Sequence, residues 1–395
     1  KYMNLKVTAI IILILFFSNI ATAQQIVFGT NNYVEYQIGT LPFVISVGHG
    51  GNLEPASIPN RTCNSPVFAV DVSTIETAMA IKNDLYTKTG CYPHLIISHL
   101  KRNKLDPNRN LADGACGNAQ ALIAWNEFHD FIATAQNTAN LQYNSKTFFI
   151  DLHGHGNPMQ RIELGYLLYD DELALPDATL NTSQYVNYST IQNLVASNVN
   201  NYTHSQLLRG PFALGTMLSN QSYTSVPSQS IPSPGINSNY FSGGYIVANH
   251  TCYAQNVSIN GLQMELYYDG IRDNVISRAA FADAFSDVLI DFMNTHFSMV
   301  WNSCNLLSTS ENTSTTTPKL FPNPVKIRNL ISFAFSDLQS YQYKMYTILG
   351  QEIKKGIVSS EMNKISTSGL ISGIYLVELT TKETGFRHVE KVIID

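Results

Sequence analysis

The chain has 395 residues, of which 44% are hydrophobic and 13% are charged, and its formal net charge is −5. At roughly 100 to 200 residues per domain this length predicts two or three domains with ample core, which excludes a mini-protein held only by disulfides. The charged fraction is about half of that in an ordinary soluble domain, so uncharged polar side chains must form much of the surface. With a negative net charge and no long basic run, the sequence provides no basic surface for binding a phosphate backbone, and we expect no nucleic acid partner.

The first 23 residues have the three parts of a secretory signal peptide. Lys1 and Lys6 supply positive charge, an apolar run follows at 7–17, and the small-residue motif ATA occupies 21–23. We expect cleavage after Ala23. A membrane anchor is the alternative, but the run is short for a bilayer, and no later apolar stretch reaches the roughly 20 residues of a transmembrane helix. The mature protein is therefore expected to contain no transmembrane segment.

Residues 24–304 alternate strand-like and helix-like patterns, which predicts an α/β domain with a mainly parallel or mixed sheet flanked by helices. The expected strands are Pro42 to Val47, His94 to Ser98, Thr147 to Leu152 and Gly261 to Tyr267. The expected helices are Val72 to Leu85, Ala119 to Ala133 and Ser277 to Phe297, and Tyr245 to Asn249 is a further patterned segment.

The C-terminal part of the chain has a different character. A Ser- and Thr-rich stretch at 305–319 is expected to be a linker, and short alternating runs within 320–395 predict a small all-β sandwich. The order of LFPNP at 320–324, YTILGQ at 346–351, GL at 369–370, GIY at 373–375 and KVII at 391–394 resembles the C-terminal sorting domain of the type IX secretion system. The resemblance implies export through the periplasm, a secreted or cell-surface location and the type IX secretion machinery as a partner. A generic sandwich that binds carbohydrate or packs on the preceding domain is the alternative.

The cysteines are expected to be structural. They are Cys63, Cys91, Cys116, Cys252 and Cys304. Their spacing matches no zinc ribbon, and in an exported chain up to two disulfides can form, which leaves at least one cysteine without an internal partner. The spacing does not determine the pairing.

Two histidines follow predicted strands, at the sheet edge where α/β proteins gather functional residues. His49 stands in a glycine-rich turn and His153 follows the third strand, and a neutral imidazole is a common Zn²⁺ ligand. A catalytic zinc has three protein ligands. Asp71 is the favoured third ligand, although it also suits a helix N-cap, and Glu54 is the alternative.

Other polar residues near these positions have more than one possible role. Asp151 precedes His153 by two residues, so it could orient a histidine or be an ordinary polar residue at a strand end. His155 could replace His153 as a ligand or contact substrate.

Four polar residues are candidates for binding a substrate carboxylate, because guanidinium groups match two carboxylate oxygens. They are Arg102, Asn108, Arg109 and Arg161. Asp106 and Glu163 could instead neutralise these arginines. Glu265 lies in an apolar strand and is the candidate general base, with a solvated edge position as the alternative. No G-x-S-x-G, recognisable cysteine nucleophile or Walker sequence is present.

Six stretches in order resemble the N-formylglutamate amidohydrolases, a family related in fold to the zinc carboxypeptidases. They are 46–59 (SVGHGGNLEPASIP), 71–76 (D-x-x-T-x-E), 102–109 (RNKLDPNR), 150–155 (IDLHGH), 161–165 (RIELG) and 263–265 (QME). The resemblance implies that His49 and His153 bind zinc, that Asn108 and Arg109 hold a substrate carboxylate and that Glu265 activates water. Gly48 and Asn52 depart from the family pattern, which leaves the third ligand open.

These observations predict a secreted zinc-dependent hydrolase of amide C–N bonds. Its substrate would be an N-acyl, N-formyl-like amino acid or a peptide end, in either case a small molecule or peptide with a carboxylate. Because the chain is exported, the substrate need not be N-formylglutamate. The alternative is a catalytically inactive surface or extracellular binding protein on the same scaffold.

Overall fold

The structure is a computed structural model. It describes residues 24–299 apart from 65, 255 and 256, and residues 319–395 apart from 328, 335–339, 348–350 and 382–386. The chain divides into two compact units between Ser303 and Cys304. The expected signal peptide at 1–23, Cys304 and the expected linker up to residue 318 lie outside the described residues.

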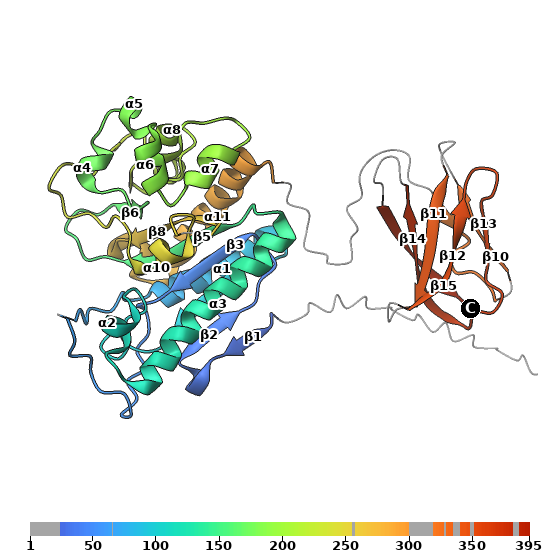
Figure 1. The fold of residues 1–395 in the computed structure, drawn as a ribbon, viewed down its shortest axis with the longest axis horizontal. Helices are drawn as coiled ribbons and strands as arrows, with labels where there is room; N and C mark the ends of the chain where they lie inside the picture. The colour runs from blue at the N-terminus through green and yellow to red at the C-terminus, as the bar shows by residue number, and fades with distance from the viewer. Residues whose placement is uncertain are drawn as a thin grey trace, which may run out of the picture. The chain divides into compact units, whose positions relative to one another are not determined.

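A mixed sheet of eight strands forms the centre of the N-terminal unit (Figure 1). The strands are β1 (Ile26–Phe28), β2 (Val34–Gln37), β3 (Phe43–Val47), β4 (His94–Ser98), β5 (Phe148–Gly154), β6 (Ile162–Gly165), β7 (Ser225–Val226) and β8 (Asn260–Leu266). Their order is β1-β2-β4-β3-β5-β8-β6-β7. The central strands β4, β3, β5 and β8 are parallel, whereas the pairs β1–β2, β2–β4 and β6–β8 are antiparallel.

The four strands expected in this unit coincide with the parallel centre of the sheet, which confirms a mixed α/β architecture. These strands are buried except for Gly154 at the end of β5, and buried parallel strands are typically rich in apolar residues. The outer strands β1, β2, β6 and β7 were not expected. They are short, and several of their residues are polar, so they lack that pattern.

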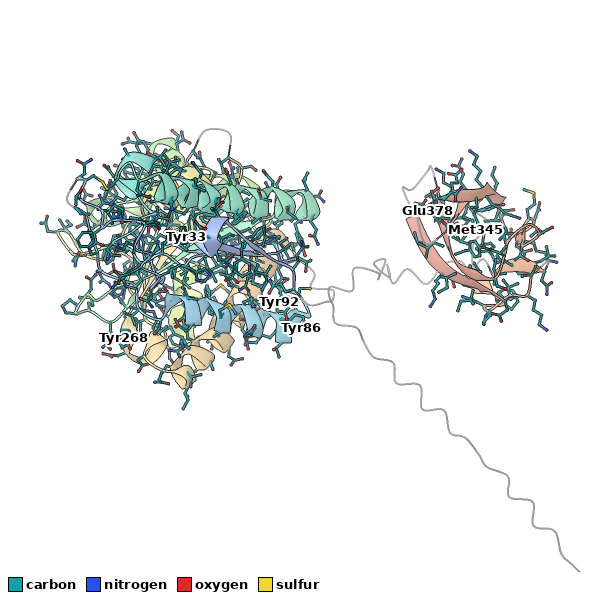
Figure 2. All side chains as sticks on the ribbon, turned by 90° about the horizontal axis from the view of Figure 1, so that it is seen from below. Tyr33, Tyr86, Tyr92, Tyr268, Met345 and Glu378 are labelled. Atoms are coloured by element: carbon teal, nitrogen blue, oxygen red, sulfur yellow. A yellow bond between two sulfur atoms is a disulfide. The ribbon has the colours of Figure 1, made fainter. Side chains whose placement is uncertain are left out.

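Helices cover both faces of the sheet. They include α1 (Thr74–Thr89), α3 (Ala119–Tyr143) and α11 (Val275–Phe297). Helix α3 shares a hydrophobic core with Val44 of β3 and Phe149 of β5. Because side chains alternate along a strand, Phe148 points to the other face, where its ring lies 5.1 Å from that of Phe292 in α11. Helix α1 packs against α11, and Tyr86 at its C-terminal end stacks on Tyr92 with ring centroids 4.1 Å apart (Figure 2).

The long helices begin and end at recognisable caps. The side chain of Asn118 accepts hydrogen bonds from the backbone N–H groups of Gln120 and Ala121, which fixes the start of α3. Helix α1 ends at Gly90, whose φ of 74° is easily reached only by glycine. Helix α3 continues ten residues beyond the predicted end at Ala133, because Ala135, Gln136 and Ala139 extend its buried face.

Short helices make up most of the remaining N-terminal unit. They are α2 (Leu111–Ala115), α4 (Asp170–Leu173), α5 (Asp177–Leu180), α6 (Ser183–Tyr188), α7 (Gln192–Ser197), α8 (His204–Arg209), α9 (Leu214–Asn220) and α10 (Tyr245–His250). Helices α4 to α8 gather on one side of the unit (Figure 1). These short helices were not expected, since each is too short to show a helical period. The patterned segment at 245–249 is helix α10.

The C-terminal unit is all-β. Its strands are β9 (Lys319–Phe321), β10 (Leu330–Ala334), β11 (Tyr341–Thr347), β12 (Glu352–Val358), β13 (Lys364–Ser366), β14 (Gly373–Thr380) and β15 (Arg387–Ile394). They form two antiparallel sheets, β13-β10-β9 and β12-β11-β14-β15. Met345 and Val377 are fully buried in a core that also contains Phe333, and Figure 2 labels Met345 in β11. Part of the YTILGQ stretch, at 348–350, lies outside the described residues.

The cysteines are structural in the part of the chain that the structure describes. Cys63 and Cys116 form a disulfide that spans 53 positions in the sequence. Cys91 is also disulfide-bonded, and Cys252 is a buried free thiol.

Candidate metal centre

Three of the predicted ligands lie together at the carboxyl edge of the central strands. His49 follows β3, His153 lies in the neighbouring strand β5, and Asp71 precedes α1. An oxygen of Asp71, Oδ2, lies 3.0 Å from Nδ1 of His153 and 3.4 Å from Nδ1 of His49. One potential ligand atom from each residue lies within 4.8 Å of those of the other two, and all three residues are buried. Two imidazole nitrogens and one carboxylate oxygen are a donor set suited to a divalent transition metal such as Zn²⁺.

The Nε2 atom of each histidine, on the side of the ring away from Asp71, contacts a further carboxylate. Nε2 of His49 lies 2.7 Å from Oδ1 of Asp106, and Nε2 of His153 lies 2.8 Å from Oδ2 of Asp151. A neutral imidazole that donates its Nε2–H to a carboxylate can present the lone pair of Nδ1 to a metal ion, and here both Nδ1 atoms face Asp71. The orientation of both rings therefore fits metal binding.

Electrostatics within the cluster is dominated by burial and by the opposite charges of its members. Burial alone raises the pKa of Asp71, but hydrogen bonds with His153 and His49 outweigh it and hold that pKa well below its usual range. Burial lowers the pKa of His153, but the charge and hydrogen bond of Asp151 outweigh it and raise that pKa.

Glu54, the alternative third ligand, lies apart from the cluster. Its side chain is 41% exposed and pairs with Lys101 at 2.5 Å and with Asn103 at 2.9 Å. Its carboxylate is therefore engaged at the surface.

Glu265 lies beside the cluster on β8. It occupies the position paired with His153 in the parallel β5–β8 ladder, so both side chains project from the same face. Its Oε1 accepts a hydrogen bond of 3.0 Å from Nε2 of Gln263. Burial, the largest cause, raises the pKa of Glu265 to about 7, with the charge of His153 opposing and that of Asp71 adding. A buried carboxyl group with such a pKa suits proton transfer near neutral pH.

Two of the predicted substrate-binding arginines are engaged with carboxylates of the chain. Nε of Arg102 donates to Oδ2 of Asp106 at 3.0 Å. Nε of Arg161 donates to Oε1 of Glu163 at 3.3 Å, and Arg161 is only 4% exposed. These are the two pairings that the sequence left open as alternatives.

Arg109 and Asn108 lie at the rim of the centre. The Arg109 side chain is 39% exposed, and its Nε lies 4.0 Å from Asp106. Nδ2 of Asn108 donates to Oε1 of Gln263 at 3.3 Å, and its Oδ1 accepts from the backbone N–H of Ile246 at 2.9 Å. Arg109 is therefore the most accessible of the predicted arginines.

His155 is not part of the cluster. Its Nε2 donates to the carbonyl of Arg161 at 2.8 Å, and its Nδ1 accepts from the backbone N–H of Asn157 at 3.1 Å. Both ring nitrogens are used within the loop that follows β5.

Sequence reasoning missed two supporting arginines, Arg61 and Arg272. Arg272 follows β8, and its guanidinium donates to the carbonyls of Val72 and His155, so it ties together the loops beside Asp71 and His153. The partners are backbone carbonyls, which leave no pattern in the sequence. Nη2 of Arg61 lies 3.4 Å from Oδ2 of Asp106, the carboxylate that contacts His49.

Several pockets are formed by the described residues, and two of them differ in their position relative to the metal centre. One, of about 400 Å³, is lined by Tyr169, Tyr188, Tyr245, Tyr253 and Gly244, among others. A Cβ atom on Gly244 would lie 2.5 Å from the amide of Asn108, so this pocket adjoins the rim of the metal centre.

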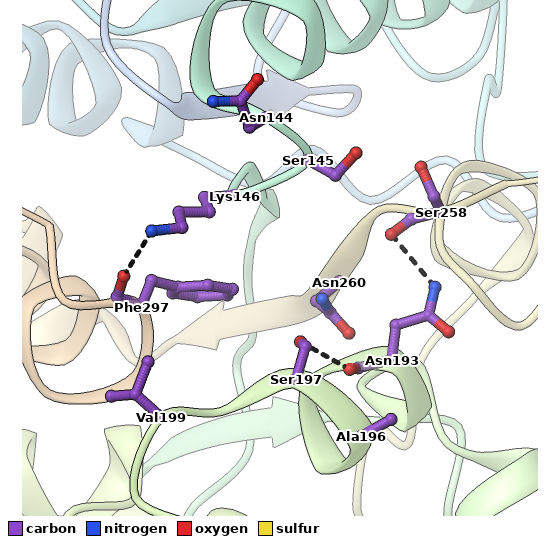
Figure 3. A pocket seen from close by; sticks show the side chains of 10 residues that line it. All are labelled: Asn144, Ser145, Lys146, Asn193, Ala196, Ser197, Val199, Ser258, Asn260 and Phe297. Carbon is purple, nitrogen blue, oxygen red and sulfur yellow. Dashed lines mark hydrogen bonds between the residues drawn. The ribbon is translucent and has the colours of Figure 1, made fainter. Parts of the chain in front are cut away.

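The other pocket, of about 410 Å³, is shown in Figure 3. Its lining includes Lys146, just before β5, and Asn260, the first residue of β8, and Lys146 donates to the carbonyl of Phe297 at 2.9 Å. Because β5 and β8 run from this end toward His153 and Glu265, the pocket lies at the opposite edge of the sheet from the metal centre.

One comparison with known proteins concerns the C-terminal unit. A family model described as a secretion system C-terminal sorting domain matches residues 319–395. Residues 319–395 are a type IX secretion sorting domain. The match confirms the predicted sorting domain, export and a secreted or cell-surface location, and it supports the type IX secretion machinery as a partner.

Two individual proteins are similar over short lengths. A beta-agarase A from Zobellia galactanivorans is 37% identical over 87 residues, which are 21% of this chain and 16% of that protein. A solved structure from work on PorZ, a surface component of the type IX secretion system of Porphyromonas gingivalis, covers 22% of this chain and 12% of that chain, with 11% identity and a TM-score of 0.18. The chain spans less than a fifth of either protein. No helix among the described residues is long and apolar enough to cross a membrane.

Proposed function

We propose that residues 24–299 form a metal-dependent hydrolase of amide C–N bonds in N-acyl amino acids or peptide ends, with a zinc carboxypeptidase-like fold. One observation carries the proposal: ligand atoms of two histidines and an aspartate lie within 4.8 Å of one another, next to the strand that carries Glu265. The resemblance to N-formylglutamate amidohydrolases involves the same residues.

The residues around the centre have distinct roles in this reaction. His49, Asp71 and His153 would hold Zn²⁺, which when bound acts as a Lewis acid that polarises a carbonyl and lowers the pKa of water. Glu265 accepts a proton from the attacking water and delivers it to the leaving nitrogen. Asp106 and Asp151 keep the two imidazoles in the orientation that metal binding requires.

The substrate is expected to carry a carboxylate that binds Arg109. Arg109 is partly exposed, whereas Arg102 and Arg161 are neutralised by Asp106 and Glu163. The tyrosine-lined pocket beside Asn108 offers aromatic surface for an acyl group or side chain of the substrate.

Metal analysis and a substrate screen test the proposal together. The purified chain should contain about one equivalent of zinc and should hydrolyse a member of a panel of N-acyl amino acids and short peptides, with activity lost on chelation. Substoichiometric zinc together with activity that survives chelation would refute it. A folded, zinc-loaded chain that binds members of the panel without turnover would favour the binding-protein alternative.

A further inference from the structure

We propose that Arg61 is a positioning residue of the metal centre. Arg61, together with the Cys63–Cys116 disulfide, holds Asp106 in place, and Asp106 in turn holds His49 in the orientation that metal binding requires. This inference rests on the proposed metal centre. It assigns a role to a buried arginine and to a disulfide that the proposed reaction does not use.

Arg61 is buried, and its guanidinium group is fully engaged. The side chain donates to three backbone carbonyls: Nε to Arg102 at 3.0 Å, Nη1 to Asp113 at 3.1 Å and Nη2 to Val67 at 2.8 Å. Nη2 also lies 3.4 Å from Oδ2 of Asp106. A planar group with donors in fixed directions can satisfy all these partners at once, which a lysine ammonium cannot.

Asp106 transmits this placement to His49. Asp106 is fully buried, and its Oδ1 lies 2.7 Å from Nε2 of His49 and accepts the backbone N–H of Asn108 at 3.1 Å. Its Oδ2 faces Arg61 and Arg102. An unpaired buried carboxylate is costly, so the charge of Arg61 stabilises the position from which Asp106 orients the imidazole.

The disulfide fixes the segment that holds Arg61. Cys63 follows Arg61 by two residues, and Cys116 directly follows α2. The α2 carbonyl that accepts from Arg61, that of Asp113, also lies 3.3 Å from Sγ of Cys63. The backbone N–H of Asp106 donates to the carbonyl of Gly114, the next residue, at 3.1 Å. The disulfide therefore joins the segment of Arg61 to the end of α2, and Asp106 contacts both.

Arg209 offers a matched control. It also donates to three carbonyls, those of Leu173, Leu175 and Pro232, and it pairs with Asp177. None of its partners belongs to the metal centre. Loss of either arginine should lower thermal stability, but only loss of Arg61 should change metal binding.

The test is Zn²⁺ affinity, measured by competition with a chromogenic chelator on the full secreted chain, together with the visible absorption spectrum of the Co²⁺-substituted protein. We expect Arg61→Met to weaken Zn²⁺ binding about 10-fold or more and to alter the Co²⁺ spectrum, as loss of a partner that supports a metal ligand does. Arg209→Met should leave both unchanged. Arg61→Lys keeps the positive charge but not the planar guanidinium group, so its Zn²⁺ affinity should lie between those of wild type and Arg61→Met.

The possible outcomes separate this inference from the proposed function. Wild-type Zn²⁺ affinity and an unaltered Co²⁺ spectrum in Arg61→Met would overturn the role of Arg61 while leaving the metal centre intact. If Arg61→Met does not fold, Zn²⁺ affinity and the Co²⁺ spectrum are measured on Arg61→Lys and on the Cys63→Ser/Cys116→Ser variant. Wild-type values in both variants would overturn the positioning role of Arg61. A wild-type chain that binds no Zn²⁺ would refute the proposed function and this inference with it.

Discussion

A buried pair of histidines beneath the candidate site should make the N-terminal unit sensitive to mild acid. Nδ1 of His129 lies 2.7 Å from Nε2 of His250, and Nε2 of His129 lies 3.1 Å from the carbonyl of Pro107. If His129 donates to that carbonyl, its Nδ1 accepts from His250, and the pair is satisfied with both rings neutral. Burial, with a smaller contribution from the neighbouring histidine, lowers the pKa of His129 to about 3. Burial likewise lowers the pKa of His250 to about 4.

The sign and size of the effect follow from these pKa values. An unfolded histidine titrates near 6.5, so below that pH the unfolded chain binds more protons than the folded chain, and the free energy of unfolding decreases. The loss continues until the pH reaches the folded-state values of about 4 and about 3. At pH 5 each histidine is about 1.5 units below its unfolded pKa, which at about 1.36 kcal/mol per unit is ~2 kcal/mol each and ~4 kcal/mol for the pair.

Urea denaturation at pH 7, 6 and 5 measures this loss. Tryptophan fluorescence reports on the pair, because the Trp125 ring centroid lies 3.9 Å from that of His129. The double variant His129→Gln/His250→Gln cannot take up these protons, so its free energy of unfolding should decrease by ~4 kcal/mol less than that of wild type between pH 7 and pH 5. Other buried histidines contribute equally to both proteins. Equal losses in wild type and variant would show that His129 and His250 do not cause the acid sensitivity.

Three further predictions concern the centre itself. Glu265→Gln should lower kcat by about 10²-fold or more while zinc content stays at the wild-type level, and unchanged kcat would remove Glu265 as general base. Asp71→Asn should weaken Zn²⁺ binding, measured by chelator competition. Glu54→Gln should leave Zn²⁺ binding unchanged, because Glu54 pairs with Lys101 at the surface. The reverse result would make Glu54 the third ligand. Arg109→Ala should raise KM for substrates with a free carboxylate and leave KM for their amides unchanged, and an equal rise for both would contradict carboxylate binding.

Much of the fold could be predicted because the decisive patterns are local. Strand β3 (FVISV) and the start of β5 (FFI) are short, mostly apolar runs buried on both faces, and α11 has a helical period over most of its length. The antiparallel edges were missed because β6 and β7 are too short to alternate detectably. The short helices between β6 and β8 are stabilised by packing of their buried residues, and they are too short to carry a period of their own.

Some features of the candidate site could likewise be predicted from local sequence, and others could not. The sorting domain could be predicted because its landmarks lie in order along one stretch, and the two histidines could be singled out because they stand at the ends of predicted strands. Folding was needed to show that Asp71, rather than Glu54, approaches both imidazoles and that Asp106 contacts His49 across 57 positions of sequence. The reason is physical: a strand's pattern depends on its own residues, but the partner of a buried charge depends on how distant loops fold back onto one sheet edge.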